Sequence, residues 1–175
     1  MTIFAPPFIV VSGPPGSGKS TLATILAGDL ALPLVAKDTI KEALMDVLPV
    51  PDVDASRRVG RAAVAAVLAV AAESPIGAVI DCNFHRSRAV EGLRKLPGRM
   101  VEVFCECKRD RCWERYQARA GTRHPGHFDA ERTIDDLWHD DVTAPVAGGW
   151  PVLNVDTNTP VGAAKVVADI RAALR

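Results

Sequence analysis

The segment Gly13-Pro14-Pro15-Gly16-Ser17-Gly18-Lys19-Ser20 matches the pattern G-x-x-x-x-G-K-[ST] at every fixed position. In this pattern a glycine-rich loop surrounds the phosphates of a nucleotide, because glycine lets successive backbone N–H groups point at phosphate oxygens. The apolar residues 8–12 before the loop are typical of a strand, and residues 19–31 after it have a helical pattern. We therefore predict a nucleotide-binding loop. The residues expected to contact the nucleotide are Gly13, Pro15, Gly16, Ser17, Gly18, Lys19, Ser20 and Thr21.

The polar residues of this loop have distinct expected roles. Lys19 would place its ammonium group between the β- and γ-phosphates, and Ser20 would offer its hydroxyl to Mg²⁺. A second apolar segment, residues 77–80, ends in Asp81. A carboxylate that follows such a strand beside a phosphate-binding loop holds Mg²⁺, often through water. The predicted metal ligands are therefore Ser20 and Asp81.

The composition excludes several classes of protein. The 175 residues include 21 Lys and Arg and 21 Asp and Glu, so the net charge is zero. This excludes a nucleic-acid binder that acts through bulk positive charge, although not one with a local basic groove. No apolar run reaches the roughly 18 residues of a membrane span, so no membrane partner is expected. Four cysteines make no disulfide framework in a chain of this length, and we expect one domain, residues 1–175, in the reducing cytoplasm.

Short apolar segments alternate with helical segments along the whole chain. This alternation predicts an α/β fold of three layers, with a five-stranded parallel sheet covered by helices on both faces. Ligands of such sheets bind at the carboxyl ends of the strands. The predicted strands are residues 8–12, 34–36, 78–82, 100–107 and 152–155. The predicted helices are residues 19–31, 38–48, 55–74, 86–96, 109–120, 129–142 and 161–174.

Asp38 directly follows the predicted strand 34–36 and is the candidate catalytic carboxylate. At this edge of the sheet it would face the acceptor side of the γ-phosphate, where it can orient an attacking hydroxyl or take its proton. A helix N-cap is an alternative role, and the two roles are compatible. Lys41, one helical turn further on, is a candidate for binding the acceptor or the γ-phosphate. Arg86, after the predicted strand 78–82, is a candidate cation near the transferred group, or else a solvated residue at a helix start.

A basic stretch between residues 108 and 123 supplies candidate phosphate ligands. Arg115 and Arg119 are four residues apart on the predicted helix 109–120, and Arg123 follows in a polar loop. Guanidinium groups suit phosphate because they form planar bidentate contacts and stay charged. A closing loop that delivers Arg119 and Arg123 would exclude water and stabilise the charge of the transferred group. The alternative is a solvated helix face that pairs with the acidic residues after 128.

The chain lacks the N-K-x-D motif that reads guanine, and it is too short for the additional domains of a motor ATPase. The order of its motifs resembles the small P-loop kinases, in the group that contains polynucleotide 5′-kinases, zeta-toxin-type kinases and chloramphenicol phosphotransferase. The resemblance covers nearly the whole chain. It implies the strand order 2-3-1-4-5, ATP as the phosphoryl donor and a short helical lid at about residues 119–130, here called the lid.

The resemblance also implies roles for individual residues. Arg115 would pack near the adenine, as would the segment that contains Asp156 and Thr157, while Arg119 and Arg123 would reach phosphates. The region around Arg57 covers the acceptor pocket in small kinases, so an anionic acceptor is one interpretation of this arginine, and a surface arginine is the other. Where polynucleotide kinases of this group have Asp-x-x-Arg, this chain has Asp38-Thr39-Ile40-Lys41, and lysine cannot form the bidentate contact of arginine with a phosphate.

The sequence therefore predicts an enzyme that transfers the γ-phosphoryl group of ATP, with Mg²⁺, to a hydroxyl of a small molecule. Lys19, Asp38, Arg119 and Arg123 are the predicted catalytic residues. Two alternatives are a kinase of 5′-hydroxyl ends of nucleic acid, which zero net charge does not favour, and a nucleotide-dependent switch without an acceptor. His124 and His127 lack a third metal ligand nearby, so they favour a contact of the lid over a metal site.

Overall fold

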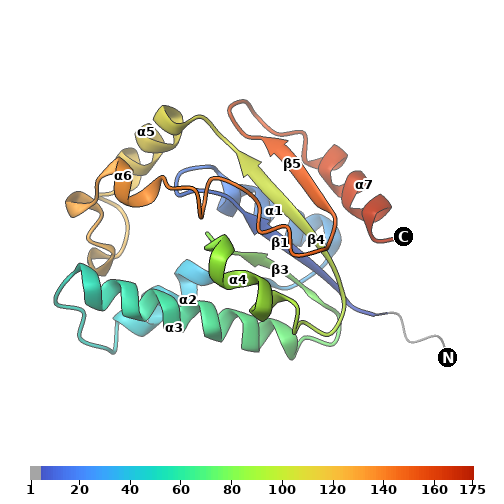
Figure 1. Cartoon of the computed structure of the whole chain (residues 1–175), viewed down its shortest axis with the longest axis horizontal. Coiled ribbons are helices and arrows are strands. Elements are labelled where there is room, and N and C mark those ends of the chain that lie inside the picture. The colour runs from blue at the N-terminus through green and yellow to red at the C-terminus, as the bar shows by residue number, and fades with distance from the viewer. Residues whose placement is uncertain (1–4) are drawn as a thin grey trace.

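The computed structural model describes residues 5–175 and contains one five-stranded sheet (Figure 1). All neighbouring strands are parallel, and their order is β2-β3-β1-β4-β5, so the predicted class of sheet and its strand order are confirmed. The central strand β1 pairs with β3 on one side and with β4 on the other. The strands are β1 (Pro7–Ser12), β2 (Leu34–Ala36), β3 (Ala78–Asp81), β4 (Arg99–Glu106) and β5 (Val152–Asp156).

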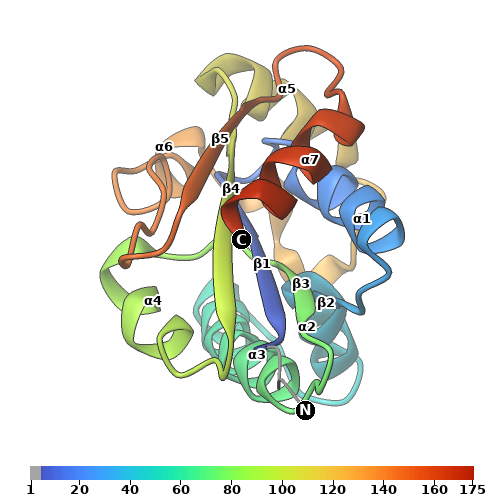
Figure 2. The same cartoon turned by 90° about the vertical axis from the view of Figure 1, so that its right-hand side faces the viewer.

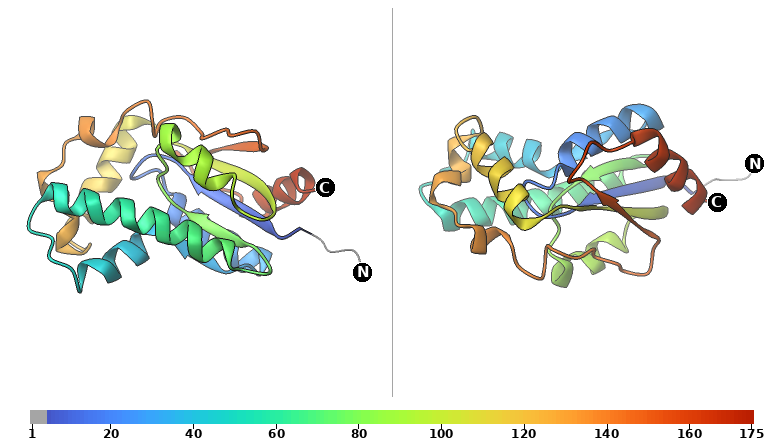
Figure 3. Two further views of the ribbon diagram at one scale, coloured as in Figure 1. Left: turned by 60° about the horizontal axis from the view of Figure 1, so that its bottom comes forward. Right: turned by 90° about the horizontal axis from the view of Figure 1, so that it is seen from above.

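Helices cover both faces of the sheet (Figure 2). Helices α3 and α4 pack on one face, and α1 and α7 pack on the other. The short helix α6 and the helix α5 lie beyond the carboxyl ends of the strands, opposite the end where the C-terminus lies (Figure 3). The helices are α1 (Lys19–Leu30), α2 (Lys37–Met45), α3 (Val53–Ala72), α4 (Arg86–Leu93), α5 (Arg109–Arg119), α6 (Ile134–Leu137) and α7 (Ala163–Ala173).

The composition of β1 explains its central place. Phe8 and Val10 belong to the core beneath α3 and α4, whereas Ile9 and Val11 belong to the core beneath α1 and α7. All four side chains are fully buried. A continuous run of large apolar residues is typical of a parallel strand with helices on both faces, because neither face meets water. The loop that follows β1 is therefore held on a rigid base.

A buried carboxylate joins the sheet to the segment before β5. Glu102, in the middle of β4, is fully buried. Its Oε1 accepts hydrogen bonds from the Ser12 hydroxyl at 2.7 Å and from the Val146 amide at 2.8 Å. Its Oε2 accepts from the Ala147 amide at 2.9 Å and from the Trp150 indole at 3.1 Å. Four donors thus compensate the burial of this group, which would be very unfavourable without them.

The predicted continuous helix 129–142 is wrong. The structure has a 3₁₀ turn at Asp129–Glu131, then the four-residue helix α6, and no further helix before β5 within the described residues. Asp129 turns inward to bind side chains of α5 and the lid. Thr133 then starts a new helix, because its hydroxyl accepts the Asp136 amide in a capping box. Side-chain contacts of Asp129 with residues outside the segment therefore override the local helical pattern.

Across residues 5–175, the structure contains no helix that is long and apolar enough to span a membrane.

Candidate active site

The loop between β1 and α1 has the conformation expected of a phosphate-binding loop. Gly16 and Gly18 have φ angles of 82° and 84°, in the left-handed region that favours glycine. A Cβ atom on Gly16 would lie 2.1 Å from the carbonyl oxygen of Cys112, so no other residue fits there without a shift of the backbone. Lys19 begins α1 and is only 8% exposed. The left-handed backbone at Gly16 and Gly18 favours glycine, and the carbonyl of Cys112 in α5 leaves no room for a side chain at Gly16.

Unpartnered polar atoms fit a bound triphosphate with Mg²⁺. Among the described residues, the Ser17 hydroxyl and one oxygen of Asp81 are buried without a hydrogen-bond partner. Asp81 ends β3, directly beside β1, while Ser20 is exposed at the start of α1. Residues 5–175 contain no cluster of three or more His, Cys, Asp or Glu that could hold a metal. Mg²⁺ is held by phosphates and water together with one or two protein ligands, and Ser20 and Asp81 are the residues that would supply them.

Residues expected on the nucleotide side come together at Gly18. Arg115 and Thr157 lie at 3.8 Å and 3.9 Å from the position of a Cβ atom on Gly18. The Arg115 guanidinium donates to the carbonyl of Thr157 at 2.9 Å, and the Thr157 hydroxyl donates to the carbonyl of Glu106. Asp156 is exposed and accepts hydrogen bonds from Asn158. Arg115 and Thr157 thus border the phosphate-binding loop, whereas Asp156 faces solvent.

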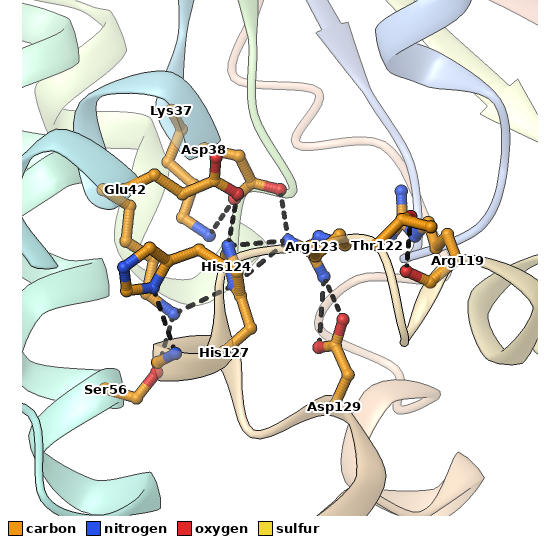
Figure 4. A network of polar contacts seen from close by, with 12 residues as sticks. Lys37, Asp38, Glu42, Ser56, Arg119, Thr122, Arg123, His124, His127 and Asp129 are labelled. Atoms are coloured by element: carbon orange, nitrogen blue, oxygen red, sulfur yellow. Dashed lines mark hydrogen bonds and ion pairs between the residues drawn. The ribbon is translucent and has the colours of Figure 1, made fainter. Parts of the chain in front are cut away.

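Asp38 lies between two cations, as Figure 4 shows. Its Oδ1 accepts from the Lys37 ammonium at 2.9 Å, and its Oδ2 accepts from the Arg123 guanidinium at 2.8 Å. Burial alone would raise the pKa of Asp38, but Lys37, Arg123 and Lys19 outweigh it and hold the pKa far below the usual range. Asp38 is therefore ionised throughout the neutral and mildly acidic range.

Arg123 links the lid to α2 and also binds another residue of the lid, Asp129. Besides Asp38, its guanidinium binds both oxygens of the buried Asp129, at 3.1 Å and 2.9 Å. The Tyr116 hydroxyl also donates to Asp129. Arg123 was predicted to reach a phosphate, and the structure places it on these two carboxylates. The prediction stays open, and the contact with Asp38 brings this arginine to the predicted acceptor side.

Both histidines of the lid contact α2. His127 is buried, its Nε2 lies 2.7 Å from Glu42, and its Nδ1 lies 3.1 Å from the Arg123 guanidinium. Burial, followed by the charge of Arg123, lowers the pKa of His127 to about 4. A neutral ring with Nε2–H donating to Glu42 and Nδ1 accepting satisfies this network. The His124 Nε2 lies 3.3 Å from Asp46, so these side chains are lid contacts, as the sequence favoured.

The Arg119 guanidinium has a nitrogen that no protein group in residues 5–175 satisfies. Arg119 ends α5, and its Nε is buried without a hydrogen-bond partner among the described residues. Its guanidinium carbon lies 5.5 Å from the centre of the Tyr116 ring, which is a cation–π contact. Burial and the nearby Arg123 lower the pKa of Arg119. A partly buried cation with an unpartnered Nε atom is suited to an anionic ligand.

A cavity of about 90 Å³ connects the phosphate-binding loop with α2, α3 and the lid. Seven of the predicted site residues line it together, namely Pro15, Lys19, Asp38, Lys41, Arg57, Arg119 and Arg123. Among them, Arg57 forms ion pairs with Asp54 and Asp136. Arg86 is exposed and is not among the residues that line this cavity in the described chain. The lining residues are Pro15, Lys19, Lys37, Asp38, Lys41, Ser56, Arg57, Asn83, Tyr116, Arg119, Arg123, His127, Asp129, Arg132 and Leu137.

Sequence reasoning missed several of these lining residues. Lys37 could have been found, because it precedes Asp38 at the end of a predicted strand, where ligands of parallel sheets bind. Asp129 belongs to the acidic run that the alternative interpretation placed on a solvated helix face, and it is instead buried. For Ser56 no sequence signal exists, because its place depends on how α3 packs against α2.

Comparisons with known proteins agree with this geometry. The family model described as AAA domain matches residues 8–145. A proposed kinase from Chloroflexus aurantiacus is 31% identical, with a TM-score of 0.86, and the match covers 98% of this chain and 100% of that chain. A comparison with curated proteins found no match.

Two more distant structures share the fold. A gluconokinase from Sinorhizobium meliloti is 22% identical, with a TM-score of 0.62, and the match covers 98% of this chain and 93% of that chain. A shikimate kinase from Acinetobacter baumannii is 15% identical, with a TM-score of 0.60, and the match covers 96% of this chain and 91% of that chain. The fold of this chain is therefore that of small kinases.

Proposed function

Because this chain belongs to the AAA domain family and has the fold of small kinases, we propose that it is an ATP-dependent kinase of a small molecule. It would transfer the γ-phosphoryl group of ATP to a hydroxyl group of the acceptor. The observation that carries this proposal is that Lys19 of the phosphate-binding loop and Asp38 line the same cavity. A phosphate-binding cation and an ionised carboxylate are the two groups that a donor and an acceptor hydroxyl need in one place.

The transfer would proceed as a displacement at the γ-phosphorus. The acceptor oxygen forms a bond to phosphorus, the bond from phosphorus to the β–γ bridging oxygen breaks, and ADP leaves with that electron pair. The acceptor proton passes to Asp38. Because the pKa of Asp38 is low, its carboxylate orients the hydroxyl first and accepts the proton late, which suits a transition state with little bond formation to the nucleophile.

The remaining residues would act through charge and position. Lys19 and Arg119 would stabilise the negative charge on the phosphoryl oxygens, and Ser20 and Asp81 would hold Mg²⁺, which neutralises charge between the phosphates. Arg123 holds Asp38 on one side and Asp129 on the other. It would thereby position the carboxylate and keep the lid over the cavity, which excludes water as a competing acceptor.

An ATP-consumption screen tests this proposal. The parent protein is incubated with MgATP and a library of hydroxyl-bearing small molecules and 5′-hydroxyl oligonucleotides, and acceptor-dependent ADP is measured. With the acceptor so found, Asp38→Asn should lower kcat by about 10²–10⁴-fold and leave the affinity for MgATP within about threefold. Lys19→Ala should abolish transfer. Asp29→Asn, at an exposed position of α1, is the matched control and should behave as the parent does.

Two results would contradict the proposal. If Asp38→Asn phosphorylates the acceptor at the parent rate, the role of this carboxylate is wrong. If no acceptor increases ADP formation, and slow hydrolysis is insensitive to Asp38, the protein is a nucleotide-dependent switch without an acceptor.

A further inference from the structure

Lys41 is a buried ammonium group without an anionic partner. The residue is 7% exposed and lines the cavity. Its Nζ donates to the Ser56 hydroxyl at 2.8 Å and lies 3.5 Å from Nδ1 of His127. Both partners are neutral, because the pKa of His127 is lowered to about 4. The charge of Lys41 is therefore uncompensated by any hydrogen-bond partner in the described chain.

The nearby carboxylates are engaged by other cations or donors. Asp38 is bound by Lys37 and Arg123, and Asp129 by Arg123. Glu42 accepts from His127 at 2.7 Å. These groups therefore stabilise the closed arrangement of the lid over α2, and none of them forms an ion pair with Lys41.

Lys41 has a defined position in spite of this uncompensated charge. Its side chain lies across α3 at Gly60, where a Cβ atom would meet the lysine side chain at 3.7–4.0 Å. The hydrogen bond to Ser56 fixes the ammonium group at the cavity. Burying a charge without a counter-ion is strongly unfavourable, so such a group is expected where a ligand supplies the opposite charge.

Further cations surround Lys41 on the acceptor side of the cavity. Arg132, two residues beyond the lid, is close enough to Lys41 to help lower its pKa, and Arg57 of α3 lines the same cavity. In all, the cavity is lined by seven Lys and Arg side chains against two Asp. Lys19 and Arg119 are assigned above to the phosphates of ATP. Lys37, Arg57 and Arg123 already pair with carboxylates, which leaves Lys41 and Arg132 for a second anion.

We propose that the acceptor carries an anionic group, a carboxylate or a phosphate, in addition to its reactive hydroxyl, and that Lys41 binds this group. This inference rests on the proposed function and names its substrate class. Asp38 and Lys41 are one helical turn apart on α2, so their Cβ atoms are separated by roughly 5–6 Å. Both residues line one cavity of about 90 Å³, so the anionic group and the hydroxyl belong to one small acceptor, such as a small hydroxy acid or a sugar phosphate.

Calorimetry with a matched panel tests this inference. A non-hydrolysable ATP analogue with Mg²⁺ saturates the phosphate-binding loop, so that added anions cannot bind there. The probes are polyhydroxy carboxylates of about three to six carbons, the corresponding phosphate monoesters and the matched neutral alditols. We expect at least one anionic series to bind, and the series that binds more tightly identifies the anionic group.

The Lys41→Met variant provides the decisive comparison. We expect it to bind the anionic probe at least about tenfold more weakly, because a charged hydrogen bond is lost. Its melting temperature should equal or exceed that of the parent, because a buried uncompensated charge has been replaced by an apolar side chain of similar length. Lys165→Met, at an exposed position of α7, is the control and should leave binding unchanged.

The results separate this inference from the proposed kinase activity. Equal binding of neutral and anionic probes, equal binding by Lys41→Met, or no binding of any anionic probe overturns the inference. Phosphorylation of a neutral acceptor that is unaffected by Lys41→Met also overturns it and leaves the kinase proposal intact. Binding of an anionic probe through Lys41 without its phosphorylation supports the anion site and counts against the kinase proposal.

Discussion

The charge of Asp38 is set by residues from three different parts of the chain. Lys37 precedes it on α2, Lys19 belongs to the phosphate-binding loop, and Arg123 belongs to the lid. Together they overcome the effect of burial and hold the pKa of Asp38 far below its usual range. A carboxylate of this kind is a weak base and a good hydrogen-bond acceptor. It is therefore suited to orienting a hydroxyl.

The low pKa of Asp38 predicts a flat acidic side of the pH–rate profile. Asp38 stays ionised when the pH falls from about 7 to about 5.5, because protonation begins only below its depressed pKa. His127 stays neutral over the same range, because its pKa is about 4. We expect kcat at saturating substrates to change by less than about twofold. Chromatographic detection of ADP measures this, and a one-proton decline centred between these pH values would contradict it.

On the alkaline side, Lys41 predicts a loss of acceptor affinity. Burial, followed by the charge of Lys37, lowers the pKa of Lys41 to about 8. The ammonium form would bind an anionic acceptor, so the affinity would be complete well below pH 8 and fall as the pH rises through it. KM for the acceptor should therefore increase between about pH 7 and pH 9, and the KM of Lys41→Met should not. The charged, titratable or hydrogen-bonding groups around Lys41 are Lys37, Asp38, Ser56, Arg123, His127 and Arg132.

Glu102 gives a stability prediction away from the cavity. A glutamine at this position would turn its NH₂ group toward two of the four donors that now point at the carboxylate. We expect Glu102→Gln to lower the free energy of unfolding by about 1–3 kcal/mol. Glu106→Gln, at an exposed position of the same strand, is the control. Urea denaturation measures both, and equal midpoints would show that the carboxylate is dispensable.

At the scale of elements, two glycines should respond in opposite ways to substitution by alanine. Gly16 has a φ of 82° and lies against the Cys112 carbonyl, whereas Gly28 is exposed in α1 with open space around it. We expect Gly16→Ala to destabilise the protein by at least about 1–2 kcal/mol and to weaken nucleotide binding. Gly28→Ala should stabilise it by about 0.5–1 kcal/mol, because alanine favours a helix. Thermal unfolding and nucleotide titration distinguish the two, and a stable Gly16→Ala that binds nucleotide would refute the first part.

The sequence predicted the elements whose pattern is local. β1 has an unbroken apolar run, and the loop after it has an unmistakable glycine spacing, so both are found at their predicted positions. Helix 129–142 was predicted wrongly, because Asp129 binds Arg123 and Tyr116 and so leaves the helical path. A pattern within the segment cannot show such contacts.

For the candidate site, the sequence identified individual residues but not the contacts between them. Asp38 and Lys41 follow a strand at a position where ligands bind, so both could be identified. The partners that set their charge could not, because Arg123 is 85 residues from Asp38 in sequence and Ser56 belongs to another helix. Burial of Lys41 without a counter-ion, which carries the inference about the acceptor, is a property of the folded chain alone.

At the scale of the whole molecule, the sheet and the lid are held by different forces. β1 is buried between two apolar layers. Within residues 5–175, polar contacts link the lid to α2 and its C-cap Asp46. They join Arg123 with Asp38, His124 with Asp46, and His127 with Glu42 and Lys41. Polar contacts that are partly exposed open more readily than a packed core. We therefore expect the lid to be the part of the cavity wall that opens to admit a substrate.

Amide hydrogen exchange should show this difference and its dependence on nucleotide. We expect the lid to exchange at least about 100-fold faster than β1, because it opens locally while the core opens only with global unfolding. A non-hydrolysable ATP analogue with Mg²⁺ should slow exchange in the lid, because phosphate oxygens would pair with the partly buried guanidinium of Arg119 at the base of the lid. In Arg119→Met the analogue should bind and leave the lid unprotected. Equal slowing in the parent and in Arg119→Met would show that another residue closes the lid.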